Sequence, residues 1–92
     1  MKREIVTVTG RVQGVGYRDT VAEIAEGYAV AGAVRNLRSG ALEIDVEGED
    51  AAVDAFVAAT IAERPPLARI DNVGRRRAAP LGVSGFSRAP TE

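Results

Sequence analysis

The sequence predicts an α+β sandwich in which two helices cover one face of a four-stranded antiparallel sheet. Stretches of alternating polarity, typical of strands, are interrupted by two stretches of helical period, and the connections between them are short. The resulting order is β-α-β-β-α-β with a trailing strand-like segment, which is the split β-α-β, or ferredoxin-like, arrangement. The chain has 92 residues, and we expect a single domain over residues 1–92.

Each predicted element has its own signal. Between residues 42 and 47, three aliphatic side chains alternate with three acidic ones, which predicts the clearest strand. Both helical stretches place apolar residues on one face, and Pro65-Pro66 ends the second. Asp50 is expected to cap that helix, and Gly40 to take a positive φ in a hairpin turn. The predicted strands are residues 4–12, 31–37, 41–47 and 68–77, with 83–88 as a candidate short fifth strand, and the predicted helices are residues 18–26 and 51–63.

The composition excludes several kinds of chemistry. The chain has no Cys and no His, so it offers no thiolate nucleophile, no Ser-His-Asp triad and no zinc site of the usual kind. Catalysis must therefore use Arg, carboxylate, amide, hydroxyl or backbone groups. The net charge of −1 gives no general attraction to nucleic acid or to acidic membranes. Because no apolar run reaches the roughly 20 residues of a membrane span and no signal peptide is evident, we expect a cytoplasmic protein.

The loop between the first strand and the first helix has the properties of an anion site. Gly14 and Gly16 leave the backbone free to curl, so that its N–H groups converge. The first N–H groups of a helix have no intrahelical acceptor, and the helix dipole adds partial positive charge there. Arg18 adds a permanent charge and a planar fork that suits phosphate oxygens. An ATP-binding loop is excluded because it needs a Lys and then a Ser or Thr after its second glycine. A plain turn with a solvated Arg18 stays open at this level.

Two motifs in the chain resemble the two signatures of the acylphosphatase family. The first is the stretch 10–18, GRVQGVGYR, and the second is 32–37, GAVRNL, followed by Ser39-Gly40. Their spacing also matches, and the similarity extends over about residues 4–73. The resemblance implies a ferredoxin-like fold and a metal-independent hydrolysis of acyl phosphates to carboxylate and inorganic phosphate, without a cofactor. It implies that Arg18 holds the phosphate and that Asn36 positions the attacking water. The phosphate-binding loop that it implies is the backbone of Gln13, Gly14, Val15, Gly16 and Tyr17.

The implied chemistry suits these residue types. An acyl phosphate is an activated anhydride whose carboxylate leaves without a general acid, so the main demands are positioning and stabilisation of charge on the phosphoryl oxygens. A cradle of N–H groups with Arg18 meets the second demand, and the Asn36 amide, which both accepts and donates, meets the first. An amide is no strong base, so we expect the proton to pass to the bound phosphate. Judged on spacing alone, Asn36 is better explained as a residue that begins the hairpin turn.

Two other classes of protein fit the same order of elements. RNA-recognition modules read bases with aromatic and basic residues on the open sheet face, where this chain has Glu43, Asp45 and Glu47. The second class is a non-catalytic module that binds acyl or carbamoyl phosphate or another partner, and the presence of both Arg18 and Asn36 argues against it. We therefore expect a monomeric enzyme whose partners are an acyl phosphate and inorganic phosphate, with no nucleic acid, no membrane and no metal.

The chain departs from the family pattern at two places. Ala33 stands where the family commonly has a large aromatic residue, and the smaller side chain is expected to loosen the packing near Asn36. The tail after Gly85 is less apolar than the family's usual last strand, so we expect that strand to be short or frayed. Arg11 and Arg35 lie beside the two motifs and are expected to be strand-face charges with local partners, although they could also steer an anionic substrate toward the site. Arg75-Arg76-Arg77 is expected to be a solvated strand end rather than a nucleic-acid patch.

Overall fold

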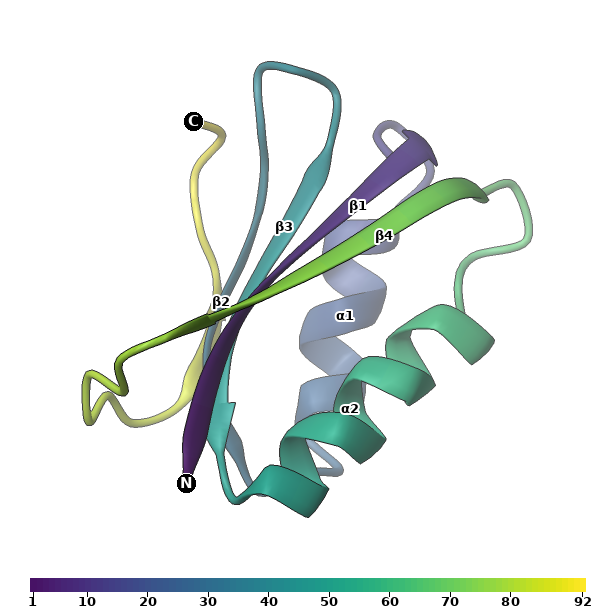
Figure 1. Ribbon diagram of the computed structural model, residues 1–92. Coiled ribbons are helices and arrows are strands. Elements are labelled where there is room, and N and C mark those ends of the chain that lie inside the picture. The colour runs from purple at the N-terminus through teal and green to yellow at the C-terminus, as the bar shows by residue number, and fades with distance from the viewer.

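The computed structural model describes all 92 residues and contains two helices on one face of a five-stranded sheet (Figure 1). The strands are β1 (Lys2–Arg11), β2 (Val30–Asn36), β3 (Leu42–Gly48), β4 (Arg69–Ala78) and β5 (Phe86–Arg88), and the helices are α1 (Tyr17–Ala25) and α2 (Asp50–Ala62). Their order in the sheet is β4-β1-β3-β2-β5. The first four strands pair antiparallel, whereas β5 lies parallel to β2. The predicted ferredoxin-like fold is confirmed, and the fifth strand makes the sheet a mixed one. Neither helix has the length and apolar character that a membrane crossing needs.

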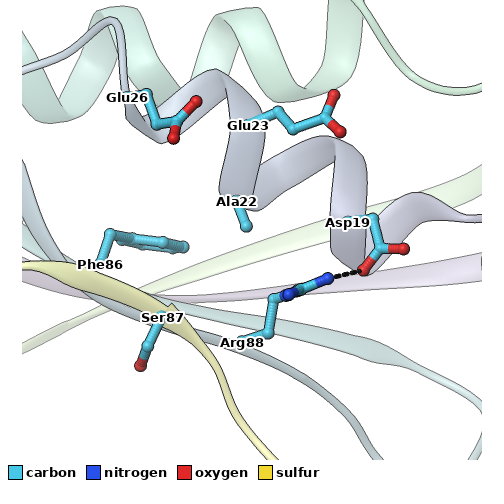
Figure 2. Close-up of a pocket in the computed structure, with 7 residues that line it drawn as sticks. All are labelled: Asp19, Ala22, Glu23, Glu26, Phe86, Ser87 and Arg88. Atoms are coloured by element: carbon cyan, nitrogen blue, oxygen red, sulfur yellow. Dashed lines mark hydrogen bonds and ion pairs between the residues drawn. The ribbon is translucent and has the colours of Figure 1, made fainter.

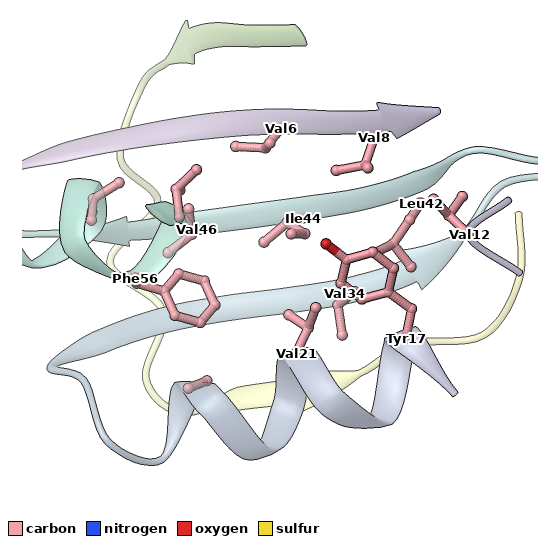
Figure 3. Close-up of a cluster of buried hydrophobic side chains, with 13 residues drawn as sticks. Val6, Val8, Val12, Tyr17, Val21, Val34, Leu42, Ile44, Val46 and Phe56 are labelled. Atoms are coloured by element: carbon pink, nitrogen blue, oxygen red, sulfur yellow. The ribbon is translucent and has the colours of Figure 1, made fainter. Parts of the chain in front are cut away.

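The hydrophobic core lies between the sheet and the two helices (Figure 3). The alternation predicted for the third strand is confirmed, because Leu42, Ile44 and Val46 of β3 are fully buried. Phe56 of α2 is fully buried as well and meets the ring of Phe86 edge-on, with the ring centroids 5.4 Å apart. Since Phe86 begins β5, this aromatic contact anchors the short edge strand to the core. Both helices bury apolar side chains against this face of the sheet, whereas the opposite face carries charged pairs and offers no apolar surface to a helix.

The element boundaries differ from the predicted ones by up to three residues, and two of these differences have a clear structural reason. Glu49 rather than Asp50 is the N-cap of α2, and its side chain makes no capping bond. The extended backbone of Glu49 (φ −59°, ψ 145°) starts the helix one residue early, and the Asp50 carboxylate instead lies 3.6 Å from the terminal ammonium group of Met1. β5 begins only at Phe86, because Gly85, at φ 75°, still belongs to the preceding turn.

The tail beyond β5 is held against the sheet and is not frayed. The Ala89 N–H donates to the Val34 carbonyl at 2.8 Å, and the Glu92 N–H donates to the Asn36 carbonyl at 3.0 Å. The Arg38 N–H in turn donates to the Glu92 carbonyl at 2.6 Å. The chain therefore follows the edge of β2 as far as Glu92. Of the two alternatives expected for the last strand, a short strand is confirmed, with β5 only 3 residues long, and a frayed one is not. The tail needs no apolar side chains to stay on the sheet, because backbone hydrogen bonds hold it there.

The sheet face opposite the helices carries charges that are paired within the protein. Arg3 donates two hydrogen bonds to Asp45, at 2.9 and 2.8 Å, and Arg35 donates to Glu43 at 2.6 Å. Glu47 is buried and accepts hydrogen bonds from two backbone N–H groups of the loop after β4. The predicted local partner of Arg35 is thus confirmed, and all three acidic side chains of β3 are engaged in the fold.

Four charged side chains tie α2 to the sheet. Lys2 and Glu4 of β1 are each 7% exposed, and the Lys2 ammonium lies 2.7 Å from the Asp54 carboxylate of α2 and 3.1 Å from Glu4. Arg75 of β4 donates to Glu4 at 2.6 Å and to Asp54 at 2.8 Å. Arg75, Arg76 and Arg77 are all exposed, as expected for a solvated strand end, and Arg75 in addition forms ion pairs with Glu4 and Asp54.

Acid is expected to weaken this network. Burial raises the pKa of Glu4, but hydrogen bonds from Arg75 and Lys2 outweigh it, so the pKa of Glu4 lies below its ordinary value of 4.5. A carboxylate with a lowered pKa stabilises the fold fully above its unfolded-state pKa and loses that contribution as the pH falls through the folded-state pKa. Glu4→Gln lacks this contribution at every pH. The difference in urea midpoint between wild type and Glu4→Gln should therefore shrink between neutral pH and about pH 3. A difference that stays constant over this range would contradict the prediction.

Candidate active site

Two glycines turn the chain from β1 into α1. Gly14 (φ 72°) and Gly16 (φ 79°) both take left-handed conformations, and Gly16 is the N-cap of α1. A Cβ atom at either position would meet nothing within 4 Å, so the backbone conformation rather than crowding calls for glycine here. These conformations account for the two glycines of the first motif.

The backbone N–H groups of this loop have no acceptor inside the protein. None of those from Gln13 to Asp19 donates a hydrogen bond to another group of the chain, and the first helical bond runs from the Thr20 N–H to the Gly16 carbonyl at 3.1 Å. Free N–H groups at the positive end of a helix dipole attract anions. The loop therefore has the donors that a phosphate site requires.

The larger side chains of the loop are engaged inside the protein. Tyr17 is buried, its hydroxyl donates to the Thr60 carbonyl of α2 at 2.7 Å, and burial raises the pKa of that hydroxyl. Val15 packs against the core. The Gln13 amide donates to two carbonyls of the β2–β3 hairpin. These three residues therefore offer a ligand their backbone rather than their side chains.

The structure brings Arg18 and Asn36 to the same cavity. Arg18 comes from the first turn of α1, and Asn36 is the last residue of β2. The cavity has a volume of about 260 Å³ and is lined by Val12, Gln13, Gly14, Gly16, Tyr17, Arg18, Asp19 and Asn36. Of the site residues that the sequence predicts, only Val15 does not line this cavity.

The Asn36 side chain has a buried oxygen without a partner. Its Oδ1 atom accepts no hydrogen bond from the chain. Burying an acceptor without a donor costs about 1–3 kcal/mol, so such an atom calls for an explanation, and a ligand is one. Ala33 lies three residues earlier in β2 and hence on the opposite face of the sheet, where it lines a separate cavity with Arg35 and Asp45. The prediction that a small Ala33 loosens the packing near Asn36 is therefore wrong.

The tail of the chain holds Arg18, a contact that the sequence did not predict. The Arg18 guanidinium donates to the Ala89 carbonyl at 3.2 Å. Asp19, the next residue, pairs with Arg88 at 2.7 Å, and no carboxylate forms an ion pair with Arg18. The guanidinium charge of Arg18 is thus free to bind a ligand, and the hydrogen bond to Ala89 fixes the orientation of the side chain. Because Ala89 acts through its main-chain carbonyl, no residue type in the sequence could have signalled this contact.

A larger groove of about 550 Å³ borders this cavity, between α1 and β5 (Figure 2). In Figure 2 the Arg88 side chain reaches from β5 toward Asp19, which lines both spaces. The groove presents three carboxylates, and its one guanidinium is already paired. The smaller cavity instead presents free N–H groups and the unpaired charge of Arg18. It is therefore the candidate site for an anion.

The fold and this cavity define a class of protein: a ferredoxin-like sandwich with an anion site at the start of its first helix. Comparison with known proteins narrows the class, since the family model described as acylphosphatase matches residues 4–88. A curated acylphosphatase of Rhodospirillum rubrum is 40% identical over 91 residues, which cover 99% of both chains. The chain belongs to the acylphosphatase family, and it is an enzyme that hydrolyses acyl phosphates.

Solved structures agree with this assignment. The crystal structure of an acylphosphatase from Bacillus subtilis matches with a TM-score of 0.90 and 32% identity, over 97% of this chain and 99% of that one. A crystal structure of full-length HypF, in the phosphate- and nucleotide-bound form, matches with a TM-score of 0.90 and 33% identity. That match covers 98% of this chain but only 12% of HypF, so the same fold also occurs as a small part of a larger protein.

Proposed function

We propose that this cavity hydrolyses carboxyl-phosphate mixed anhydrides without a metal ion, with the phosphate held by the loop and Arg18 and the water oriented by Asn36. The observation that carries the proposal is the cavity itself. It joins free backbone N–H groups, an arginine without a carboxylate partner and a buried amide oxygen without a donor. These groups are complementary to a phosphate and to a water beside it.

The phosphate end is bound by charge and by hydrogen bonds. The N–H groups of residues 13–18 donate to phosphoryl oxygens, and the Arg18 guanidinium neutralises part of their charge. The loop is fixed at one side because the Tyr17 hydroxyl is bonded to the Thr60 carbonyl of α2. Donors that are already in place need no reorganisation when charge shifts during the reaction.

The reaction is a displacement at phosphorus. Water attacks in line, the new P–O bond forms, and the bond to the acyl oxygen breaks with its electron pair on the leaving carboxylate. Asn36 Oδ1 accepts one hydrogen of the water and so aims a lone pair at phosphorus. An amide does not take up the proton, which passes to a phosphoryl oxygen of the substrate itself. The carboxylate is a stable anion and leaves without a general acid.

We expect the site to work without added metal. Hydrolysis of benzoyl phosphate is expected to continue in EDTA at a rate within about twofold of the untreated enzyme, and inorganic phosphate is expected to inhibit competitively. The hydrolysis rate in EDTA is measured by the absorbance of the acyl phosphate. The inhibition by inorganic phosphate is measured by a Dixon plot. Loss of activity in EDTA that Mg²⁺ restores would contradict metal independence. Phosphate binding without any turnover would instead favour a non-catalytic binding module.

We propose further that residues 1–92 act as one monomeric domain in the cytoplasm. A monomer is sufficient for the proposed reaction, because one chain supplies the loop N–H groups, Arg18 and Asn36. Sedimentation equilibrium across the concentrations used for activity tests it.

A further inference from the structure

The side chain of Gln13 links the phosphate-binding loop to the hairpin that carries Asn36. Its Nε2 atom donates to the Leu37 carbonyl at 2.7 Å and to the Ala41 carbonyl at 3.0 Å. Carbonyl oxygens only accept, so the two contacts fix which end of the amide faces the hairpin. Both amide hydrogens are thereby used within the protein.

The two carbonyls belong to a hairpin turn that is closed by its own bonds. The Gly40 N–H donates to the Leu37 carbonyl at 3.0 Å, and the Leu37 N–H donates to the Ala41 carbonyl at 2.8 Å. Gln13 is therefore not needed to form the turn. What it adds is a link across the cavity, from the loop that precedes α1 to the residue directly after Asn36.

We propose that Gln13 is a positioning residue, which fixes where Asn36 stands relative to the phosphate-binding loop and thereby the line along which the water attacks. This inference rests on the proposed function. A displacement of about 1 Å at a reacting group can cost on the order of 100-fold in rate, so a link between the two halves of the cavity matters to the reaction. Since neither Nε2 hydrogen is free, the Gln13 side chain acts through Asn36 and does not itself hold the phosphate.

The first test separates turnover from phosphate affinity. Gln13→Ala removes both links and leaves Arg18 and the backbone N–H groups of the loop. We expect kcat for benzoyl phosphate to fall about 10- to 100-fold, while the inhibition constant of inorganic phosphate changes by less than about threefold. The control is Arg3→Gln, which removes the two side-chain hydrogen bonds of 2.9 and 2.8 Å to Asp45 on the sheet face opposite the helices. It should lose stability but keep kcat within about twofold of wild type.

The second test is a double-mutant cycle with Asn36. If Gln13 acts through Asn36, the variant Gln13→Ala/Asn36→Ala is as slow as Asn36→Ala alone, within about threefold. If the two losses multiply, Gln13 acts independently of Asn36; the positioning role is then overturned while the proposed function stands. If Asn36→Ala alone keeps the wild-type kcat, it is the proposed function that fails. An inhibition constant for phosphate that rises as much as kcat falls would assign Gln13 to phosphate binding and overturn the inference.

Discussion

Replacing Arg18 by Gln is expected to lower kcat/KM for benzoyl phosphate by about 10²–10³-fold, because the variant loses a charged donor to the transferring phosphoryl group. Gln keeps a neutral amide but has neither the permanent charge nor the planar fork of a guanidinium. Weaker inhibition by inorganic phosphate should accompany the loss of rate. Because no ion pair depends on Arg18 and its one internal bond goes to the Ala89 carbonyl, the urea midpoint should change little.

Two further variants separate the contributions of charge and geometry. Arg18→Lys keeps the charge but not the fork, so its rate is expected to lie between those of wild type and Arg18→Gln. Arg11→Gln removes the same charge from an exposed position in the same motif and should change kcat/KM by less than about threefold. Equal losses in Arg11→Gln and Arg18→Gln would mean that general attraction of anions, rather than contact at the site, explains the effect.

The sequence predicts the fold well where burial alone decides the structure. β3 is the clearest case, because Leu42, Ile44 and Val46 are fully buried on one face. Of the acidic side chains on the other face, two form ion pairs with arginines and the third accepts hydrogen bonds from backbone N–H groups. The prediction fails where a single backbone angle decides. Asp is a favoured capping residue, but Asp50 is already the first helical residue, and Glu49 before it, with an extended backbone, is the N-cap.

The candidate site is predicted from side-chain types and missed where main-chain atoms act. Arg18 and Asn36 carry chemistry that a motif can signal, and they do line one cavity. The Ala89 carbonyl that receives Arg18 carries no such signal, because every residue has a carbonyl. For the same reason the sequence does not show that the Gln13 side chain is committed to the hairpin. Those contacts exist only once the tail and the hairpin lie beside the loop.

Replacing Asn36 by Ala is expected to lower kcat for benzoyl phosphate by about 10²-fold, because the attacking water loses the group that aims it. The phosphate end of the site is untouched, so the inhibition constant of inorganic phosphate should change by less than about threefold. Steady-state kinetics with phosphate as inhibitor measure both quantities. Arg18 differs in this respect, because its loss is expected both to lower the rate and to weaken the binding of phosphate.

Stability provides a second and independent measure of the role of Asn36. Its Oδ1 is buried without a donor, so removing the amide takes away an unfavourable term and should raise the free energy of unfolding by up to about 1 kcal/mol. Greater stability combined with a lower rate is the result expected when a residue is kept for function rather than for folding.

Asn36→Asp sharpens the test, since it keeps the shape of the side chain but places a negative charge near the phosphate. We expect it to be as slow as Asn36→Ala or slower, whereas an Asp variant that matches or exceeds wild type would show that the position needs a base and not an oriented amide.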